Sequence, residues 1–233
     1  MFELKISGPG KNALGSELMA SLQVQLKEAA GQPLLLTGDG DAFSAGLNLK
    51  EVASLDAEGM NTFLGGLQAL TNMLFDYPGP TVALINGHAI AGGCVLALCC
   101  DYRVAADVPR AKIGLNELAL GLRFPPQLLR ILSHQLTAPV LERVVLSARL
   151  FDPKGALAAG LVHEVAEDAE AVAKAHLEAL AAIPADAYAA GKATLRAGLT
   201  TPNPDEDRLF RESVIPAWVS PELKAKIRAV LTR

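Results

Sequence analysis

Short apolar segments alternate with helical stripes over the first half of the chain, and this alternation constrains the fold more than any other feature. Residues 33–37, 81–85 and 102–106 have the length and composition of strands buried in a sheet. Leucines recur every four residues from Leu14 to Leu26, and apolar residues recur at helical spacing from Met60 to Leu74. The first half of the chain is therefore predicted to be α/β.

The second half of the chain has a different pattern. After Pro126 helical stripes follow one another and strand signals become sparse. No low-complexity linker and no internal repeat divides the sequence of 233 residues. We therefore predict one α/β domain over 1–233, with an α/β core in 1–125 and a mainly helical region in 126–233.

Composition narrows the classes of partner. Hydrophobic residues make up 51% of the chain and charged residues only 20%, so we expect another subunit to cover some apolar surface. The net charge of −4 argues against non-specific nucleic-acid binding. No apolar run approaches the ~20 residues that span a bilayer, and residues 1–5 lack a signal-peptide pattern. These features predict a homo-oligomer without nucleic-acid or membrane partners.

The cysteines indicate the compartment and argue against a metal site. Cys94, Cys99 and Cys100 lie within a short stretch and have no distant partner for a disulfide. They also lack the spacing and the histidine partners of a zinc site. We expect a cytoplasmic protein with no bound metal. The Gly-rich turns lack the Gly-Lys-Ser/Thr of a phosphate loop and the paired acid of a dinucleotide site.

Two Gly-containing segments are candidates for ligand contact. Residues 43–49, Phe-Ser-Ala-Gly-Leu-Asn-Leu, follow a predicted strand and turn. Residues 85–98 run from a buried strand through Ala91-Gly92-Gly93 into an apolar helix. A helix start offers free N–H groups and the positive end of the helix dipole, which suits a developing oxyanion. Each segment alone is also compatible with an ordinary tight turn.

Glu117 is the candidate acid. It is the only acidic residue between Asp107 and Glu142, and it lies in the apolar segment 113–118. A lone glutamate is most often a solvated surface residue. Apolar surroundings favour a raised pKa and a catalytic role instead.

These three segments, in this order and spacing, resemble the signature of the crotonase (enoyl-CoA hydratase/isomerase) family. The resemblance extends over nearly the whole chain, and residues 113–121 are most similar to the mitochondrial-type Δ3,Δ2-enoyl-CoA isomerase branch. It implies a spiral of ββα units, with C-terminal helices that pack subunits into a trimer or hexamer. It also implies an acyl-CoA thioester as substrate, so that coenzyme A enters with the substrate and no separate cofactor is needed.

The resemblance also implies a role for each matching position. Ala45 and Gly92 would give backbone N–H groups to the thioester oxygen, and Glu117 would be the base. The stretch Ala45, Gly46, Leu47, Asn48 and Leu49 would line the CoA site, with Asn116 beside the acyl chain. Acyl-pocket residues are expected near 60–74, in 118–124 and in the C-terminal helices.

Val95 stands where the hydratases of the family carry a second carboxylate. Hydration needs a water held and deprotonated while a proton reaches the α-carbon, whereas shifting a double bond from C3 to C2 needs one base and an oxyanion hole. The sequence therefore favours a Δ3,Δ2-enoyl-CoA isomerase of fatty acid metabolism with weak hydratase activity. The alternatives are a hydratase, an acyl-CoA thioester hydrolase and a non-catalytic CoA-binding subunit.

Overall fold

The computed structural model describes residues 1–232 and contains two parallel sheets. The larger sheet has the order β1-β2-β4-β6-β8, and the smaller has the order β3-β5-β7. The strands are β1 (Phe2–Ile6), β2 (Leu34–Gly38), β3 (Ala42–Ser44), β4 (Thr81–Ile85), β5 (His88–Ile90), β6 (Tyr102–Ala106), β7 (Ile113–Gly114) and β8 (Glu164–Ala166).

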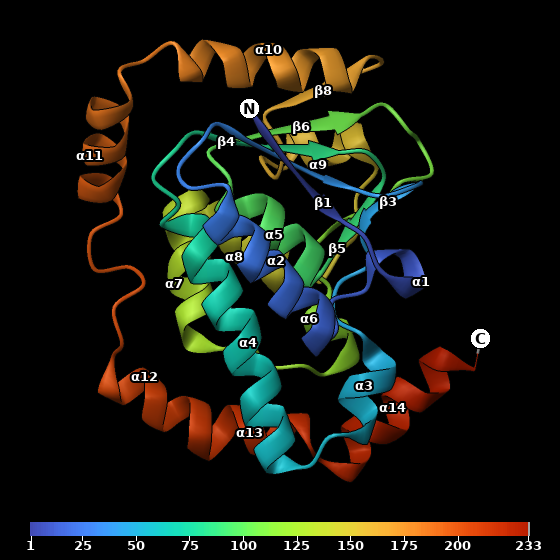
Figure 1. Ribbon diagram of the computed structural model, residues 1–233. Coiled ribbons are helices and arrows are strands. Elements are labelled where there is room, and N and C mark those ends of the chain that lie inside the picture. Colours follow the sequence, from blue (N-terminus) through green and yellow to red (C-terminus); the bar gives the residue numbers. More distant parts are fainter. Residues whose placement is uncertain (233) are drawn as a thin grey trace.

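Helices surround these sheets (Figure 1). In the first half they are α1 (Pro9–Asn12), α2 (Ser16–Glu28), α3 (Leu49–Ser54), α4 (Ala57–Phe75), α5 (Gly92–Cys99) and α6 (Glu117–Leu120). In the second half they are α7 (Pro126–Gln135), α8 (Ala138–Ser147), α9 (Pro153–Ala158), α10 (Ala169–Ala181), α11 (Ala185–Leu195), α12 (Pro204–Leu209), the π-helical turn η1 (Phe210–Val214), α13 (Ile215–Trp218) and α14 (Pro221–Leu231).

The chain repeats one unit three times. In each unit a strand of the large sheet is followed by a strand of the small sheet and then by helix: β2-β3-α3-α4, β4-β5-α5 and β6-β7-α6. Because all strand pairs are parallel, the units stack as a spiral. The predicted α/β core and the spiral of ββα units are confirmed.

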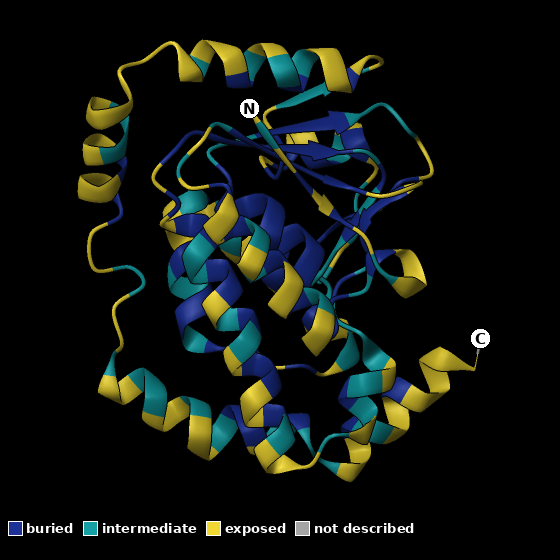
Figure 2. Ribbon diagram, in the orientation of Figure 1, coloured by how far each residue is buried: buried dark blue, intermediate teal, exposed yellow. Residues whose placement is uncertain are grey.

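The large sheet is covered on both faces. Leu4, Ile6 and the helices α2, α4 and α5 form the main core on one face. On the other face Ala173 and Leu177 of α10 pack against strand residues that include Leu35 and Val82. Figure 2 shows β2 and β4 buried between these layers. Burial on both faces explains why these two strands are continuous apolar runs, whereas exposed and buried residues alternate in the edge strand β1.

The helical prediction for 126–233 holds for most of the segment, with one exception. Residues 164–166 form β8, which adds a fifth strand beside β6. With three residues, β8 is too short to give a strand pattern in the sequence. No helix within 1–232 is long and apolar enough to cross a membrane.

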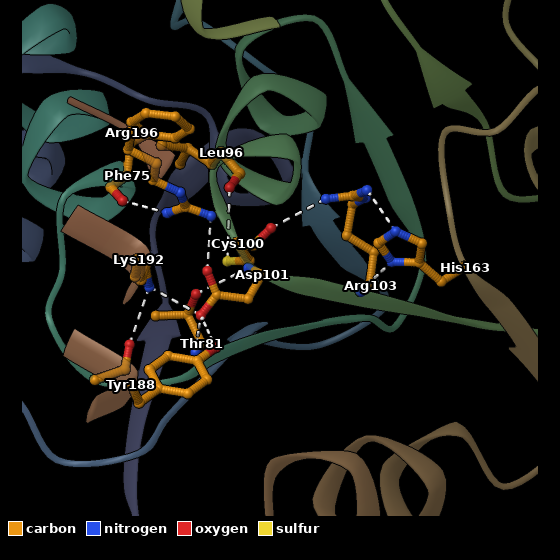
Figure 3. Close-up of polar contacts among 11 residues, drawn as sticks. Phe75, Thr81, Leu96, Cys100, Asp101, Arg103, His163, Tyr188, Lys192 and Arg196 are labelled. Carbon is orange, nitrogen blue, oxygen red and sulfur yellow. Dashed lines mark hydrogen bonds and ion pairs between the residues drawn. The ribbon is translucent and has the colours of Figure 1, made fainter. Parts of the chain in front are cut away.

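A buried ion cluster fastens α11 to the sheet (Figure 3). Asp101 follows α5, and its carboxylate accepts a hydrogen bond from the Thr81 N–H at 2.8 Å. It also lies 2.8 Å from Lys192 Nζ and 2.7 Å from the Arg196 guanidinium, and it accepts from Tyr188 Oη at 2.8 Å. The cluster therefore joins the start of β4 to a helix in the second half of the chain.

Candidate active site

A cavity of about 170 Å³ lies between the small sheet and the helical region. Its walls come from three groups of residues: the loop after β3, the turn from β5 into α5, and the segment from Asn116 to Leu128. Leu67 of α4, Trp218 of α13 and Val230 of α14 complete the lining. All three regions expected to supply acyl-pocket residues therefore contribute to one cavity.

Glu117 brings the only carboxylate into this lining. The residue begins α6 and is only 7% exposed, and its Oε2 has no hydrogen-bond partner within residues 1–232. Burial raises the pKa of the Glu117 carboxyl from 4.5 to about 7. A carboxylate poised near neutral pH in an apolar cavity can both take and return a proton.

Asn116 places a second unpaired polar group at the cavity wall. It precedes α6, and its Oδ1 is buried without a partner within 1–232. A buried amide oxygen without a partner costs free energy in the empty protein. That cost is removed when a ligand or a water supplies a donor, so Asn116 fits the predicted position beside the substrate.

Gly92 supplies a free backbone donor. It is the first residue of α5, and no acceptor within 1–232 receives its N–H. The preceding Ala91 has φ 50° and ψ −121°, a rare conformation that turns the chain from β5 into the helix. The N-terminus of a helix favours negative charge, so Gly92 N–H is placed to stabilise an oxyanion.

Ala45 does not supply the second donor, and this corrects the expectation from the sequence. The Ala45 N–H donates to the Lys11 carbonyl at 2.9 Å, which ties the loop after β3 to α1. An N–H that already has a backbone acceptor is not free for a substrate oxygen. Ala45 still lines the cavity, so its contact with substrate stays a prediction.

Leu47 is placed to supply the donor instead. The Leu14 N–H donates to the Gly46 carbonyl at 2.7 Å, and the Asn48 N–H donates to the Leu14 carbonyl at 2.9 Å. Because backbone groups alternate in direction along an extended segment, the Leu47 N–H points away from Leu14. It has no acceptor within 1–232, and Leu47 lines the cavity together with Gly92.

The loop after β3 passes close to the start of α5. A Cβ built on Gly46, the residue before Leu47, would lie 3.4 Å from Gly92 N and 2.7 Å from the Ile90 carbonyl oxygen. Gly46 has φ 89°, a conformation that favours glycine. Glycine at position 46 therefore allows the backbone before Leu47 to approach the start of α5 closely.

Val95 also lines the cavity, one helical turn after Gly92. Its side chain is apolar and buried, so no second carboxylate faces Glu117 across the lining. Cys94 is fully buried, and burial raises the pKa of its thiol to about 12, so it is a packed residue. His88 is outside the lining, where its Nδ1 accepts from the Lys112 N–H.

The predicted CoA-binding stretch divides between two adjoining cavities. Leu47 and Leu49 line both the inner cavity and an outer one, whereas Asn48 lines only the outer one. Lys50 and Leu231 are also at the outer cavity. Asn48 has a further structural role, because its Oδ1 accepts from the N–H groups that begin α3. Gly46 lines neither cavity and acts through the close approach described above.

Comparison with known proteins agrees with this arrangement. The family model described as enoyl-CoA hydratase/isomerase matches residues 1–217. The human mitochondrial enoyl-CoA delta isomerase 1 is 35% identical over 201 residues, which are 83% of this chain and 66% of that protein. This chain therefore spans slightly less than two thirds of that relative.

Solved structures extend the similarity to the fold. Human mitochondrial delta3-delta2-enoyl-CoA isomerase superposes with a TM-score of 0.87 at 30% identity, covering 99% of this chain and 92% of that one. An enoyl-CoA hydratase from Bacillus halodurans superposes with a TM-score of 0.83 at 25% identity, covering 97% and 95%. Both an isomerase and a hydratase are thus among the similar structures.

Proposed function

The chain belongs to the enoyl-CoA hydratase/isomerase family, and from that premise we propose that it is a Δ3,Δ2-enoyl-CoA isomerase of fatty acid metabolism. The observation that supports the proposal best is a single buried carboxylate, Glu117, in a cavity where the apolar Val95 stands one turn after the oxyanion donor Gly92. Isomerisation needs one base, whereas hydration in this family is expected to need two carboxylates.

In the proposed reaction each of these groups has one role. The thioester oxygen of a 3-enoyl-CoA accepts hydrogen bonds from the N–H groups of Leu47 and Gly92, which makes the C2 protons more acidic. Glu117 removes a C2 proton, and the electron pair delocalises over the thioester and the C3–C4 double bond as a dienolate. The protonated Glu117 then returns the proton to C4, leaving the double bond between C2 and C3.

The apolar lining favours this outcome over the addition of water. Val95 cannot hold or deprotonate a water molecule, and its neighbours in the cavity are largely apolar. A cavity without bound water strengthens the hydrogen bonds to the oxyanion and keeps water from the dienolate. We expect weak hydratase activity for the same reason.

The test of the proposal is a direct comparison of the two reactions. Purified protein is given a 3-enoyl-CoA, and appearance of the conjugated 2-trans-enoyl-CoA is followed while hydration of a 2-enoyl-CoA is measured in parallel. Fast isomerisation with little hydration is expected. Faster hydration would overturn the proposal in favour of a hydratase, and turnover of neither would leave a thioester hydrolase or a non-catalytic CoA-binding subunit.

Activity is expected to depend on pH with one ionisation near neutrality. The base must be the carboxylate, and burial raises the pKa of Glu117 to about 7. For the free enzyme, kcat/KM should therefore fall about tenfold per pH unit well below pH 7 and reach a plateau above it. A pH profile of kcat/KM checks this, and an acid limb near the ordinary pKa of a glutamate would contradict it.

The oxyanion site is expected to be sensitive to a single methyl group. Gly46→Ala would place a Cβ 2.7 Å from the Ile90 carbonyl and 3.4 Å from Gly92 N, so one of the two backbone segments must move. We expect kcat to fall about 10²- to 10³-fold, the effect of losing one oxyanion donor. Steady-state kinetics on the purified variant measures it.

Gly40 offers a matched control. It also has a positive φ, 70°, but a Cβ at this position would meet nothing within 4 Å. Gly40→Ala therefore carries similar backbone strain without the clash, and its kcat should stay near that of the wild type. Equal kcat values for the two variants would show that catalysis does not depend on the close approach of Gly46 and Gly92.

A further inference from the structure

The inner cavity is small and closed at the end formed by three helices. Leu67 of α4, Leu128 of α7 and Trp218 of α13 are each at most 3% exposed, and all three line the cavity. The helices α4, α7 and α13 belong to one core, since α4 contacts both α7 and α13. This end of the cavity is therefore a packed wall and not an opening to solvent.

Trp218 is held in place within this wall. Its indole Nε1–H donates to the Arg123 carbonyl at 2.7 Å, which satisfies the only polar atom of the side chain. The ring is thereby fixed against the segment that leads from Glu117 to α7. A long acyl chain could pass between α4, α7 and α13 only if this hydrogen bond and the surrounding packing were broken.

The volume limits the number of carbon atoms. A closed apolar cavity of about 150 Å³ is known to bind benzene, which has six carbons. By the same measure, the present cavity of about 170 Å³ holds about six to eight carbon atoms. Since Leu47, Gly92 and Glu117 also line it, this number includes the thioester carbon and the reacting atoms.

We propose that the enzyme acts on short- to medium-chain acyl-CoA thioesters of about six to eight acyl carbons, with Leu67, Leu128 and Trp218 as the residues that set the limit. The inference rests on the proposed function only in placing an acyl thioester at Glu117. Within the limit each added CH₂ is buried, and beyond it each added CH₂ has no place in the cavity.

Binding of saturated acyl-CoAs tests the limit without requiring turnover. Trp218 is the only tryptophan of the chain, so its fluorescence reports a chain that reaches the wall. Butanoyl-, hexanoyl-, octanoyl-, decanoyl- and dodecanoyl-CoA are titrated, with calorimetry for variants that lack the indole. Burying two CH₂ groups contributes about 1.6 kcal/mol, so Kd should fall about 15-fold per two carbons. It should stop falling after about eight carbons.

Two variants are expected to shift the break, which is the chain length at which Kd stops falling. Leu67→Ala and Trp218→Ala remove side-chain volume from the wall, and each should extend the fall in Kd by about two carbons or more. Leu22→Ala in α2 is the matched control, because Leu22 is equally buried but does not line the cavity. It should lower stability without moving the break. Leu67→Ala covers the case in which Trp218→Ala does not fold.

The outcomes separate this inference from the proposed function. Two results would overturn the chain-length limit while leaving isomerisation intact. One is a wild-type Kd that keeps falling through dodecanoyl-CoA. The other is a Kd that stops falling at the same chain length in the wild type, Leu67→Ala and Leu22→Ala. A break near eight carbons without turnover of any 3-enoyl-CoA would support the limit and overturn the isomerase.

Discussion

Glu117→Gln is expected to lower kcat for isomerisation about 10²- to 10⁴-fold, the range that general acid–base catalysis contributes. The substitution keeps the size of the side chain and removes only its capacity to take a proton. Leu47 and Gly92 keep their free N–H groups, so affinity for the thioester should change little. Steady-state kinetics with a 3-enoyl-CoA, together with titration of a saturated acyl-CoA, separates the two effects.

The same variant should be more stable than the wild type at alkaline pH. Burial raises the folded-state pKa of Glu117 to about 7, above its unfolded value near 4.5. The folded protein therefore holds the proton more tightly, and stability falls as pH rises from about 4.5 through 7. Above pH 8 the ionised Glu117 costs about 3 kcal/mol, at 1.36 kcal/mol per pKa unit.

Glutamine has no charge to bury, so unfolding experiments at pH 8.5 and pH 4 distinguish the variants. A gain in stability at pH 8.5 and little difference at pH 4 are expected. Activity within a few fold of the wild type would show that Glu117 is not the base. Lost activity with reduced stability at both pH values would instead point to damaged packing around α6.

The sequence predicted the longer strands of this fold better than the short ones. Strands β4 and β6 lie at the predicted residues, because a strand covered on both faces must be apolar along its whole length. Strands β3, β7 and β8 have two or three residues each, and a period of two cannot be recognised over so few positions. Their positions depend on neighbours that are distant in sequence.

The sequence predicted which segments form the site, but not which atoms of those segments are free to bind substrate. The sequence indicated Glu117, Gly92 and the loop after β3, and the structure brings them to one cavity. Which N–H of that loop is free depends on the partners of its neighbours. Ala45 donates to Lys11, whereas Leu47 faces away from Leu14. Such pairing between distant segments is a tertiary property, and spacing alone does not determine it.

The partners of Asp101, which matter for stability, were also not predictable from the sequence. Asp101 lies between an apolar helix and a strand, and its carboxylate accepts a hydrogen bond from the Thr81 N–H. It pairs with Lys192 of α11 and with Arg196, which directly follows that helix, and their side chains are only 7% and 9% exposed. Nothing local to Asp101 indicates Lys192 and Arg196, because the ion cluster forms only when the C-terminal helices pack on the core (Figure 3).

Asp101→Asn is expected to destabilise the protein by about 3 to 5 kcal/mol, the cost of removing one partner of a buried ion pair. Asparagine keeps the shape but leaves two buried cations without a counter-charge and turns an N–H₂ group toward other donors. Urea unfolding at pH 7 measures the loss.

The matched control is Asp107→Asn, since Asp107 pairs at 3.0 Å with Lys154, which is 73% exposed. An exposed pair contributes under about 1 kcal/mol. Equal effects of the two substitutions would mean that water reaches the Asp101 cluster and that the ion pairs do not fasten α11 to the sheet.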